Sequence, residues 1–405
     1  MLDSAHEDLK KVDAITYPSI ELDIVLAKAT AMRFISGYSA PPVRWALTRA
    51  RELCGKCNDT ITRFNVEWGL FQGNLVSGNV SAARALADRL LLDSSGHPEL
   101  PRVDALLADG MAAFHAGDFD RARQSFQTGV TMTRPESDEP HFFTHGQNPG
   151  VFCLSYLAHT QCFLGELDQA RKTIERSVAL SEMRARNAAH IYGYVNALTF
   201  AVRVHEFCGE TAREEIRARQ ILDISRRNGF RYYEAVSTCH LAWTTGLGGN
   251  LSDGISQMSD GITALERTGT SLSVPHFFVL LAELHSRAHQ LDEAEGAIER
   301  AITSTTSRTQ AWDAEIDRVR GDIIAMKASA NVEKAISAYE SSLAIAQRQK
   351  ARLFALNTTA SLARQLQRIG RDGEARAQLD KSLEQLREGR DTLPVRRARA
   401  IRELL

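Results

Sequence analysis

The chain has 405 residues, and its 49 lysines and arginines nearly balance its 50 aspartates and glutamates, which gives a formal net charge of −1. This balance excludes a general electrostatic field that would attract nucleic acid or an anionic membrane. No run approaches the ~20 apolar residues of a membrane span, and the start MLDSAHEDLKKVDA is neither a signal nor a transit peptide, so we expect a cytoplasmic protein with no nucleic-acid or membrane partner.

Paired helices are predicted from the beginning of the chain. After a lead segment at 1–20, the apolar pattern predicts a helix that begins at Glu21 and breaks at Gly37. Its partner begins at Pro41, because proline suits the first turn of a helix. The first two helices therefore form a hairpin.

Cys54 and Cys57 form a C-x-x-C pair at the end of the second predicted helix. A redox or zinc site would need a preceding strand or a second pair of this kind, and the sequence has neither. We therefore expect all six cysteines to be reduced thiols packed in or beside the core.

One pattern returns along almost the whole chain and is clearest at 114–132. One helix ends there, a tight turn follows, and a second helix carries Phe119, Ala122, Phe126 and Val130. Steps of three, four and four residues put these side chains on one stripe of a helix. The segment thus predicts a helix pair that hides one stripe against its neighbours.

A small residue at the second position of this stripe marks the register of the repeat. It recurs at intervals of 37 to 48 residues, apart from one gap of 84 that holds two units, at Ala46, Ala83, Ala122, Ala170, Gly254, Ala294, Ala335 and Ala375. Paired helices approach to roughly 8–10 Å only where one side chain is short. The predicted fold class is therefore all-α: a right-handed α-solenoid of about nine TPR-like units over 21–388, followed by a C-terminal capping helix at 389–405.

The longest departure from the repeat is an inserted loop at 134–150, which has three prolines and two glycines. Long loops on a rigid scaffold often carry function, so this loop is a binding candidate through His141, His145, Gln147 and Asn148. The two histidines lie four residues apart, a metal-like spacing only within a helix, which the flanking prolines disfavour. The alternative is that they cap or decorate the loop.

The unit at 187–228 is the least regular copy of the repeat. Its first helix has the usual pattern, whereas its second is rich in arginine and keeps only a degenerate stripe near Glu214. Further on, Ser329, Ala330 and Asn331 stand where a glycine turn is usual. We expect less regular joints at both places.

The tail RDTLPVRRARAIRELL is predicted to form a short amphipathic helix. Such a helix would cover the last apolar face, as the end of a solenoid requires. Its Arg396, Arg397 and Arg399 could attract phosphate, but a solvated capping helix is the favoured interpretation.

The sequence contains none of the common catalytic motifs. It has no phosphate loop, no G-x-G-x-x-G after a strand, no H-E-x-x-H and no G-x-S-x-G. Asp118, Asp120 and Asp168 fall in turns between paired helices, where carboxylates start helices by accepting backbone N–H groups. We therefore predict a protein that is not an enzyme and has no cofactor and no metal.

Aromatic residues on the first helices of the units are a second set of binding candidates. These helices line the concave surface of such repeats, and the candidates are Tyr156, Tyr192, Tyr194, Trp243 and His276. Aromatic rings at helical spacing usually pack in a core. Those that do not would anchor a peptide or a partner helix.

Three phrases of the sequence resemble a known family: GYSAPPVRWALTRARELC, THGQNPGVFCLSYLAHTQCFLGELDQA, and the late stretch from QKARLFALNTTASLARQLQRIG to the end. They are similar to the C-terminal tetratricopeptide-like region of large bacterial signalling proteins. In that family a class III adenylate or guanylate cyclase domain, or another effector, precedes an AAA-type ATPase module and then this helical array. The resemblance covers the chain from about Glu21 on and implies a regulatory, partner-binding role, whereas the sequence itself contains no cyclase domain and no ATPase module.

Two functional hypotheses follow. In the first, the chain is an interaction and regulatory scaffold whose concave groove and 134–150 loop bind a protein segment or a neighbouring effector domain, such as an upstream cyclase or ATPase domain. In the second, which only the resemblance implies, the array is the ligand-sensing regulatory part of an adenylate cyclase or ATPase signalling protein, with catalysis outside this chain.

Overall fold

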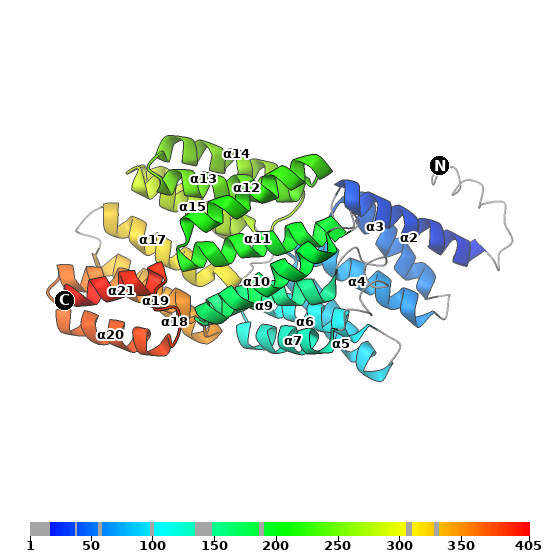
Figure 1. Cartoon of the computed structure of the whole chain (residues 1–405), viewed down its shortest axis with the longest axis horizontal. Helices are drawn as coiled ribbons and strands as arrows, with labels where there is room; N and C mark the ends of the chain where they lie inside the picture. Colours follow the sequence, from blue (N-terminus) through cyan, green and yellow to red (C-terminus); the bar gives the residue numbers. More distant parts are fainter. Residues whose placement is uncertain are drawn as a thin grey trace.

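Helix pairs account for the architecture of the computed structural model, which describes residues 17–36, 39–55, 59–97, 101–133, 148–185, 190–304, 310–327 and 332–405 (Figure 1). Within these ranges every regular element is helical, so the all-α, TPR-like fold class is confirmed. The nine pairs are α2 (Tyr17–Ser36) with α3 (Pro41–Cys54), α4 (Thr60–Val76) with α5 (Val80–Gly96), α6 (Arg102–His115) with α7 (Phe119–Met132), α9 (Pro149–Leu164) with α10 (Leu167–Arg184), α11 (Ile191–Cys208) with α12 (Thr211–Asn228), α13 (Arg231–Leu247) with α14 (Leu251–Arg267), α15 (Val274–Arg287) with α16 (Leu291–Thr303), α17 (Asp313–Lys327) with α18 (Val332–Gln349), and α19 (Arg352–Arg368) with α20 (Asp372–Gln385). A short 3-10 helix, η3 (Gln310–Trp312), precedes α17, and α21 (Leu393–Glu403) ends the described chain.

Local sequence signals set the helix ends. Asp118 caps α7 by accepting a hydrogen bond from the backbone N–H of Arg121 at 3.1 Å, as its place in a turn predicts. Gly165 and Gly209 end α9 and α11 with φ of 80° and 71°, a left-handed conformation that favours glycine. The turns inside the pairs are therefore encoded locally.

The helix α12 differs from what the sequence predicts. The degenerate stripe near Glu214 predicts a less regular joint, yet α12 is a continuous helix of 18 residues that follows the same glycine turn as its neighbours. That prediction is wrong because polar contacts of Glu214 replace the apolar contacts of the other units. The second place, at 329–331, lies outside the described residues.

The five cysteines of the described part, Cys54, Cys153, Cys162, Cys208 and Cys239, are free and buried. The prediction of core thiols is confirmed for these five, and Cys57 lies outside the described residues. Burial raises the pKa of the Cys162, Cys208 and Cys239 thiols, so they stay protonated at neutral pH. In the part of the chain that the structure covers, no helix has the length and apolarity that crossing a bilayer requires.

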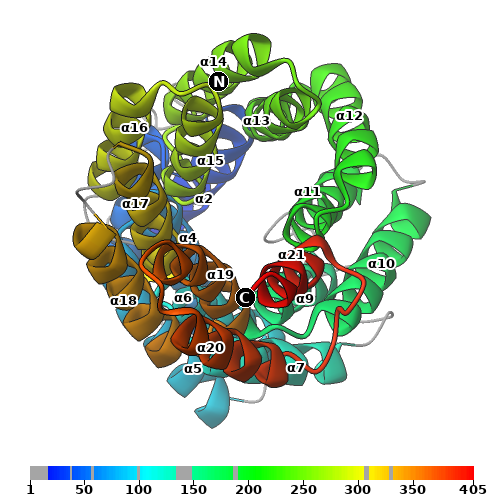
Figure 2. The same cartoon turned by 90° about the vertical axis from the view of Figure 1, so that its left-hand side faces the viewer.

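The helix pairs follow one another around a ring, so that late units lie beside early ones (Figure 2). Ser39 donates a hydrogen bond to the carbonyl of Gly269 at 2.7 Å, and the ammonium of Lys350 reaches the carboxylate of Asp120 at 2.5 Å. Each of these pairs is 230 residues apart in the chain. With units of about 40 residues, one superhelical turn therefore takes roughly five to six units.

Contacts between superhelical turns help to bury one inner helix, α9, on every side. All sixteen residues of α9 are buried, because α7, α10 and α11 flank it and α19 contacts it from the later turn. A helix that is apolar all round suits such a position. At the end of the array, α21 covers α19 and α20 with buried Val395, Ala398 and Ile401, so the capping role is confirmed.

The substitution Gly254→Ala tests the close approach of α13 and α14. An added Cβ would lie 2.9 Å from both the N and the Cα atoms of Gly246, and backbone cannot yield without moving the helix. We expect the free energy of unfolding, measured by urea denaturation, to fall by about 1–3 kcal/mol.

Gly296→Ala is the matched control. It lies inside α16 with no atom within 4 Å of the added Cβ. It should leave the free energy of unfolding unchanged or raise it by about 0.5–1 kcal/mol, because glycine weakens a helix interior. Equal effects of the two substitutions on the free energy of unfolding would contradict the close approach of α13 and α14.

Candidate functional site

Rings from both superhelical turns meet at the centre of the array, and we call this group the aromatic centre: Phe163, Phe207, His276, Trp312 and Phe354. The rings of His276 and Trp312 stack with centroids 4.3 Å apart and an interplanar angle of 22°. Those of Phe163 and Phe354 lie 4.5 Å apart although their helices, α9 and α19, belong to different turns. The inner face of the middle units is therefore packed side chain against side chain.

A row of polar side chains follows the same inner face, and we call it the polar inner stripe. Each member is buried and has a nitrogen or oxygen atom without a hydrogen-bond partner among the described residues: His115, His159, Asn196, Arg203, His240, His276 and Trp312. They come in turn from α6, α9, α11, α13, α15 and η3. A buried polar atom left unpaired costs about 1–3 kcal/mol, so this face is stabilised when a hydrogen-bonding group lies against it.

Three histidines of the polar inner stripe, His115, His159 and His240, have lowered pKa values. Burial, together with the positive charge of Arg203, lowers the pKa of His115 to about 3. The same two causes hold the pKa values of His159 and His240 well below the ordinary range. At neutral pH each of these imidazoles can both donate and accept a hydrogen bond.

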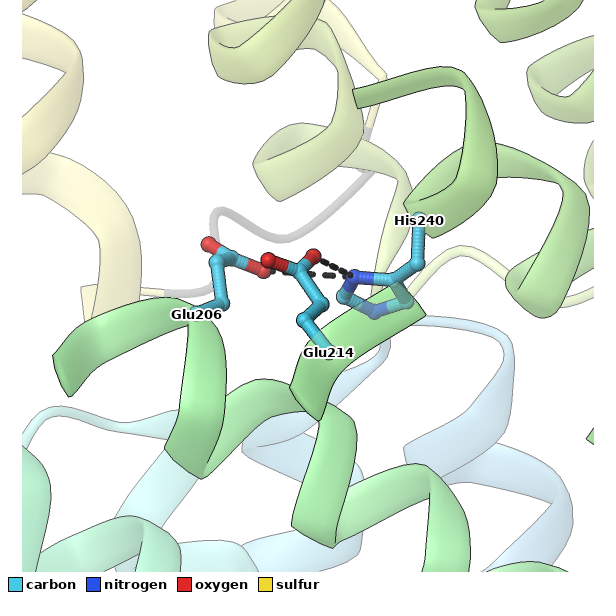
Figure 3. Close-up of side chains that lie close together, drawn as sticks. All are labelled: Glu206, Glu214 and His240. Carbon is cyan, nitrogen blue, oxygen red and sulfur yellow. Dashed lines mark hydrogen bonds and ion pairs between the residues drawn. The ribbon is translucent and has the colours of Figure 1, made fainter. Parts of the chain in front are cut away.

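Two carboxylates and two histidines gather beside the aromatic centre and form the acid–histidine cluster: Glu206, Glu214, His240 and His276. Figure 3 shows the first three, which come from α11, α12 and α13 and point toward one another. Nδ1 of His240 lies 3.0 Å from Glu214 and 3.4 Å from Glu206. Nε2 of His276 lies 3.1 Å from Glu206, so one carboxylate links two imidazoles.

Burial favours the neutral form of Glu214, the second carboxyl of the acid–histidine cluster. Burial, and then the charge of Glu206, raises the pKa of Glu214 well above its ordinary value. A protonated Glu214 donates a hydrogen bond to Nδ1 of the neutral His240, and His276 donates through Nε2 to Glu206. With a protonated Glu214 the cluster is thus a hydrogen-bonded network, and the positive charge of Arg203 lies close by.

The same donors could hold a divalent ion. One imidazole nitrogen and two carboxylates are ligands that Zn²⁺ accepts, and ligands about 2.0–2.2 Å from a tetrahedral ion are separated by distances similar to those found here. However, a cation in this place would face the guanidinium of Arg203. The neutral network therefore explains the geometry better than a metal site does.

The register of the repeat contained one sequence signal that indicated a buried polar site in this cluster. Glu214 stands at the position where the other units carry alanine or glycine, as Ala170 and Gly254 do. A buried glutamate at a small-residue position requires a partner. The partner could not be found from the sequence, because His240 belongs to the next unit and lies 26 residues away.

Three of the aromatic candidates are buried on inner helices. Tyr156 packs against Phe200 with centroids 4.6 Å apart, and His276 belongs to the aromatic centre. Trp243 is 7% exposed and lies under the guanidinium of Arg287. They serve first as core residues.

Tyr192 and Tyr194 are half-buried and lie away from the aromatic centre. The ring of Tyr192 contacts Tyr233 of the next unit, with centroids 5.3 Å apart. Burial and the neighbouring charge of Glu182 on α10 raise the pKa of Tyr194. The structure therefore does not bring these two tyrosines together with the other candidates.

The loop candidates divide into two groups. Asn148 is buried at the start of α9, where its side chain accepts a hydrogen bond from the N–H of Val151 at 3.0 Å and caps the helix. His141, His145 and Gln147 lie outside the described residues. The sequence also missed the functional candidates Arg203 and Glu206, which look like ordinary charged residues of a helix.

No protein-family model matches this sequence, and no curated protein does. The structure is similar to that of a Rap protein complexed with competence and sporulation factor, with a TM-score of 0.62 and 10% identity over 92% of this chain and 99% of that one. It is also similar to the Rap conjugation gene regulator of plasmid pLS20 in complex with the Phr* peptide (TM-score 0.53, 10% identity, 96% of each chain). The apo quorum sensor NprR from B. thuringiensis has a TM-score of 0.51 at 10% identity, over 92% of this chain and 100% of that one.

Identities of this size show the fold alone. The TPR-like helical-repeat character that the family resemblance implies is therefore confirmed. A link to class III cyclases is not shown by these structures.

The substitution Glu214→Gln tests the protonation of the acid–histidine cluster. Because the folded-state pKa of Glu214 is raised, its contribution to stability is present below the unfolded pKa and is lost as pH rises. Glutamine has the same shape but does not titrate, so the variant does not lose this stability as pH rises. The free energy of unfolding of the variant minus that of the parent should therefore increase between pH 5 and pH 8, by at most about 1.4 kcal/mol per pH unit. Urea denaturation at the two pH values measures it.

EDTA and zinc provide the second readout for this cluster. Neither should move the melting temperature of the parent chain if Glu214 is a neutral acid. A metal site would give the opposite pattern, with EDTA lowering the melting temperature and Glu214→Gln destabilising the chain at both pH values.

Proposed function

We propose that the chain is a regulatory scaffold that binds an extended segment of a peptide or protein along the polar inner stripe. A cytoplasmic location and the absence of enzymatic activity, both expected from the sequence, belong to the same proposal. The predicted loop at 134–150 is included as an accessory binding element, although its last two residues, Pro149 and Gly150, already belong to α9, the helix that carries Tyr156 and His159.

The observation that carries the proposal is the row of unpaired polar atoms on successive inner helices. An extended peptide offers one N–H and one C=O group at almost every residue. Imidazole, carboxamide and indole groups such as those of His159, Asn196 and Trp312 can pair with such a backbone. A stripe of side chains with this chemistry supports a main-chain ligand better than it supports a purely apolar one.

The similarity in fold to two solved complexes also supports a peptide ligand. Two of the similar structures are complexes, one with competence and sporulation factor and one with the Phr* peptide. Both align with more than nine-tenths of this chain. A solenoid of this length is therefore compatible with the binding of a peptide.

Entry of a ligand requires the superhelical turns to separate at the rim. The rim contacts include the ion pairs of Lys350 with Asp120 and of Arg171 with Asp391, each with one largely exposed partner. Such pairs stabilise by about 0–1 kcal/mol each. The binding energy of a peptide could therefore open the rim without unfolding a helix pair.

Selection from a random peptide display library against the whole chain tests the proposal. We expect enriched peptides with a common motif, and a loss of affinity of up to about 10-fold for the Asn196→Ala chain, measured by calorimetry, because one or two hydrogen bonds are removed. The control Asn228→Ala removes an exposed carboxamide from α12, outside the stripe, and should bind like the parent.

The display experiment can also contradict the proposal. A library that yields no common motif, or peptides that bind both variants as tightly as the parent, would exclude the polar inner stripe as the peptide site. Circular dichroism of both variants checks that they are folded.

A second candidate function is the ligand-sensing regulatory part of an adenylate cyclase or ATPase signalling protein. The three phrases that resemble the C-terminal region of such proteins support it. The partner would then be a neighbouring cyclase or ATPase domain rather than a free peptide.

Turnover assays with ATP and GTP test this second candidate and the enzyme prediction together. We expect no cyclic nucleotide and no phosphate release from the isolated chain, because its sequence has no phosphate loop and no cyclase domain. Turnover that survives purification and scales with protein concentration would overturn the prediction.

A further inference from the structure

A cavity of about 330 Å³ opens at the C-terminal end of the superhelix. Its walls come from the inner helices α15, α17 and α19, from Tyr339 of α18 and from the capping helix α21. Figure 2 shows these helices around the C-terminal side of the ring. Five arginines line the cavity, and we call it the arginine pocket: Arg287, Arg318, Arg364, Arg368 and Arg397. None of the residues proposed for peptide binding on the polar inner stripe belongs to its lining.

One of the five arginines is part of the scaffold. Arg318 is buried and forms ion pairs with Glu283 at 2.6 Å, with Glu315 at 2.5 Å and with Asp322 at 2.6 Å. These carboxylates raise its pKa well above the ordinary value. Arg318 therefore fixes the floor of the pocket, and its charge is more than neutralised.

The other arginines lack comparable partners. Arg287 lies over the ring of Trp243, and Arg368 donates to the carbonyl of Ala325 at 3.4 Å. Within the described ranges, Arg364 and Arg397 have neither a hydrogen bond nor an ion pair at contact distance. The lining holds five guanidinium groups and only two carboxylates, Glu283 and Asp322, so positive charge is in excess there.

Two other positive charges lie close to Arg397. Much of its side-chain surface is open to solvent, but Arg397 lines the pocket, where protein atoms crowd around it. This crowding, and then the positive charges of Arg364 and Arg318, lowers the pKa of Arg397. An anion placed between Arg364 and Arg397 would relieve the repulsion.

We propose that the arginine pocket binds the phosphate group of a small phosphate ester. A phosphate monoester carries nearly two negative charges at neutral pH and therefore offsets more of the excess positive charge of the pocket than a carboxylate, with one charge, would. Guanidinium groups bind phosphate oxygens in a bidentate manner. The apolar side chains of Val319 and Met326 in the same wall offer a contact for the organic part of the ester.

This site is independent of peptide binding. It lies at the mouth of the superhelix and not on the polar inner stripe, and its ligand is a small anion. Its test contains no peptide, so a failure of one proposal does not decide the other.

Calorimetry and thermal melting of the whole chain with AMP, inorganic phosphate, adenosine and acetate at equal ionic strength test the proposal. AMP and inorganic phosphate should bind and raise the melting temperature, whereas adenosine and acetate should not. The variants Arg364→Gln and Arg397→Gln should each weaken AMP binding by about 10-fold or more, because a charge-assisted hydrogen-bonding group is lost.

Arg399→Gln is the matched control, because Arg399 is an exposed arginine on the same helix that does not line the pocket. It should bind AMP as the parent does. Three results would each overturn the proposal: no binding of AMP or phosphate, acetate binding as tightly as phosphate, or AMP affinity that neither pocket variant changes. Parent-like melting of the variants without ligand shows that all of them are folded.

Discussion

The contact between superhelical turns is the constraint on which the rest of this structure depends. A helix pair buries one stripe against each neighbour along the chain, but the inner helices of the middle units have further apolar surface that only a later turn can cover. Phe163 of α9 and Phe354 of α19 provide that cover although 191 positions separate them. The burial of two such rings gives several kcal/mol of hydrophobic stabilisation and offsets the entropy of closing a long loop, which grows only slowly with its length.

Polar groups in this dense interior destabilise the fold unless they form hydrogen bonds, either with one another or with a ligand. In the acid–histidine cluster these groups pair with one another: burial raises the pKa of Glu214, which favours its neutral form, and its carboxyl lies at hydrogen-bond distance from His240. In the polar inner stripe the pairing is only partial, because atoms on His115, His159 and Asn196 keep unused hydrogen-bonding capacity. That difference separates a structural network from a surface suited to a ligand.

Charge is distributed unevenly although the total is nearly zero. The net charge of −1 excludes a general field, yet the superhelix collects arginines from four helices at one mouth. Arg364 on α19 and Arg397 on α21 are ordinary solvated residues when their helices are considered alone. The capping helix thus acquires a second role, because closing the last apolar face also places a guanidinium group opposite two others.

Local chemistry in the sequence determined the helix pairs, their caps and the small residues at close contacts. Each of these features depends only on residues nearby in the sequence, from one helical turn away to one repeat away. Asp118 and Gly254 could therefore be interpreted correctly before any coordinates. Only the tertiary structure decided which inner residues meet, because a small angle at each joint accumulates over five units before Lys350 reaches Asp120. The partner of Glu214 and the arginine pocket depend on that accumulated geometry, which no local pattern records.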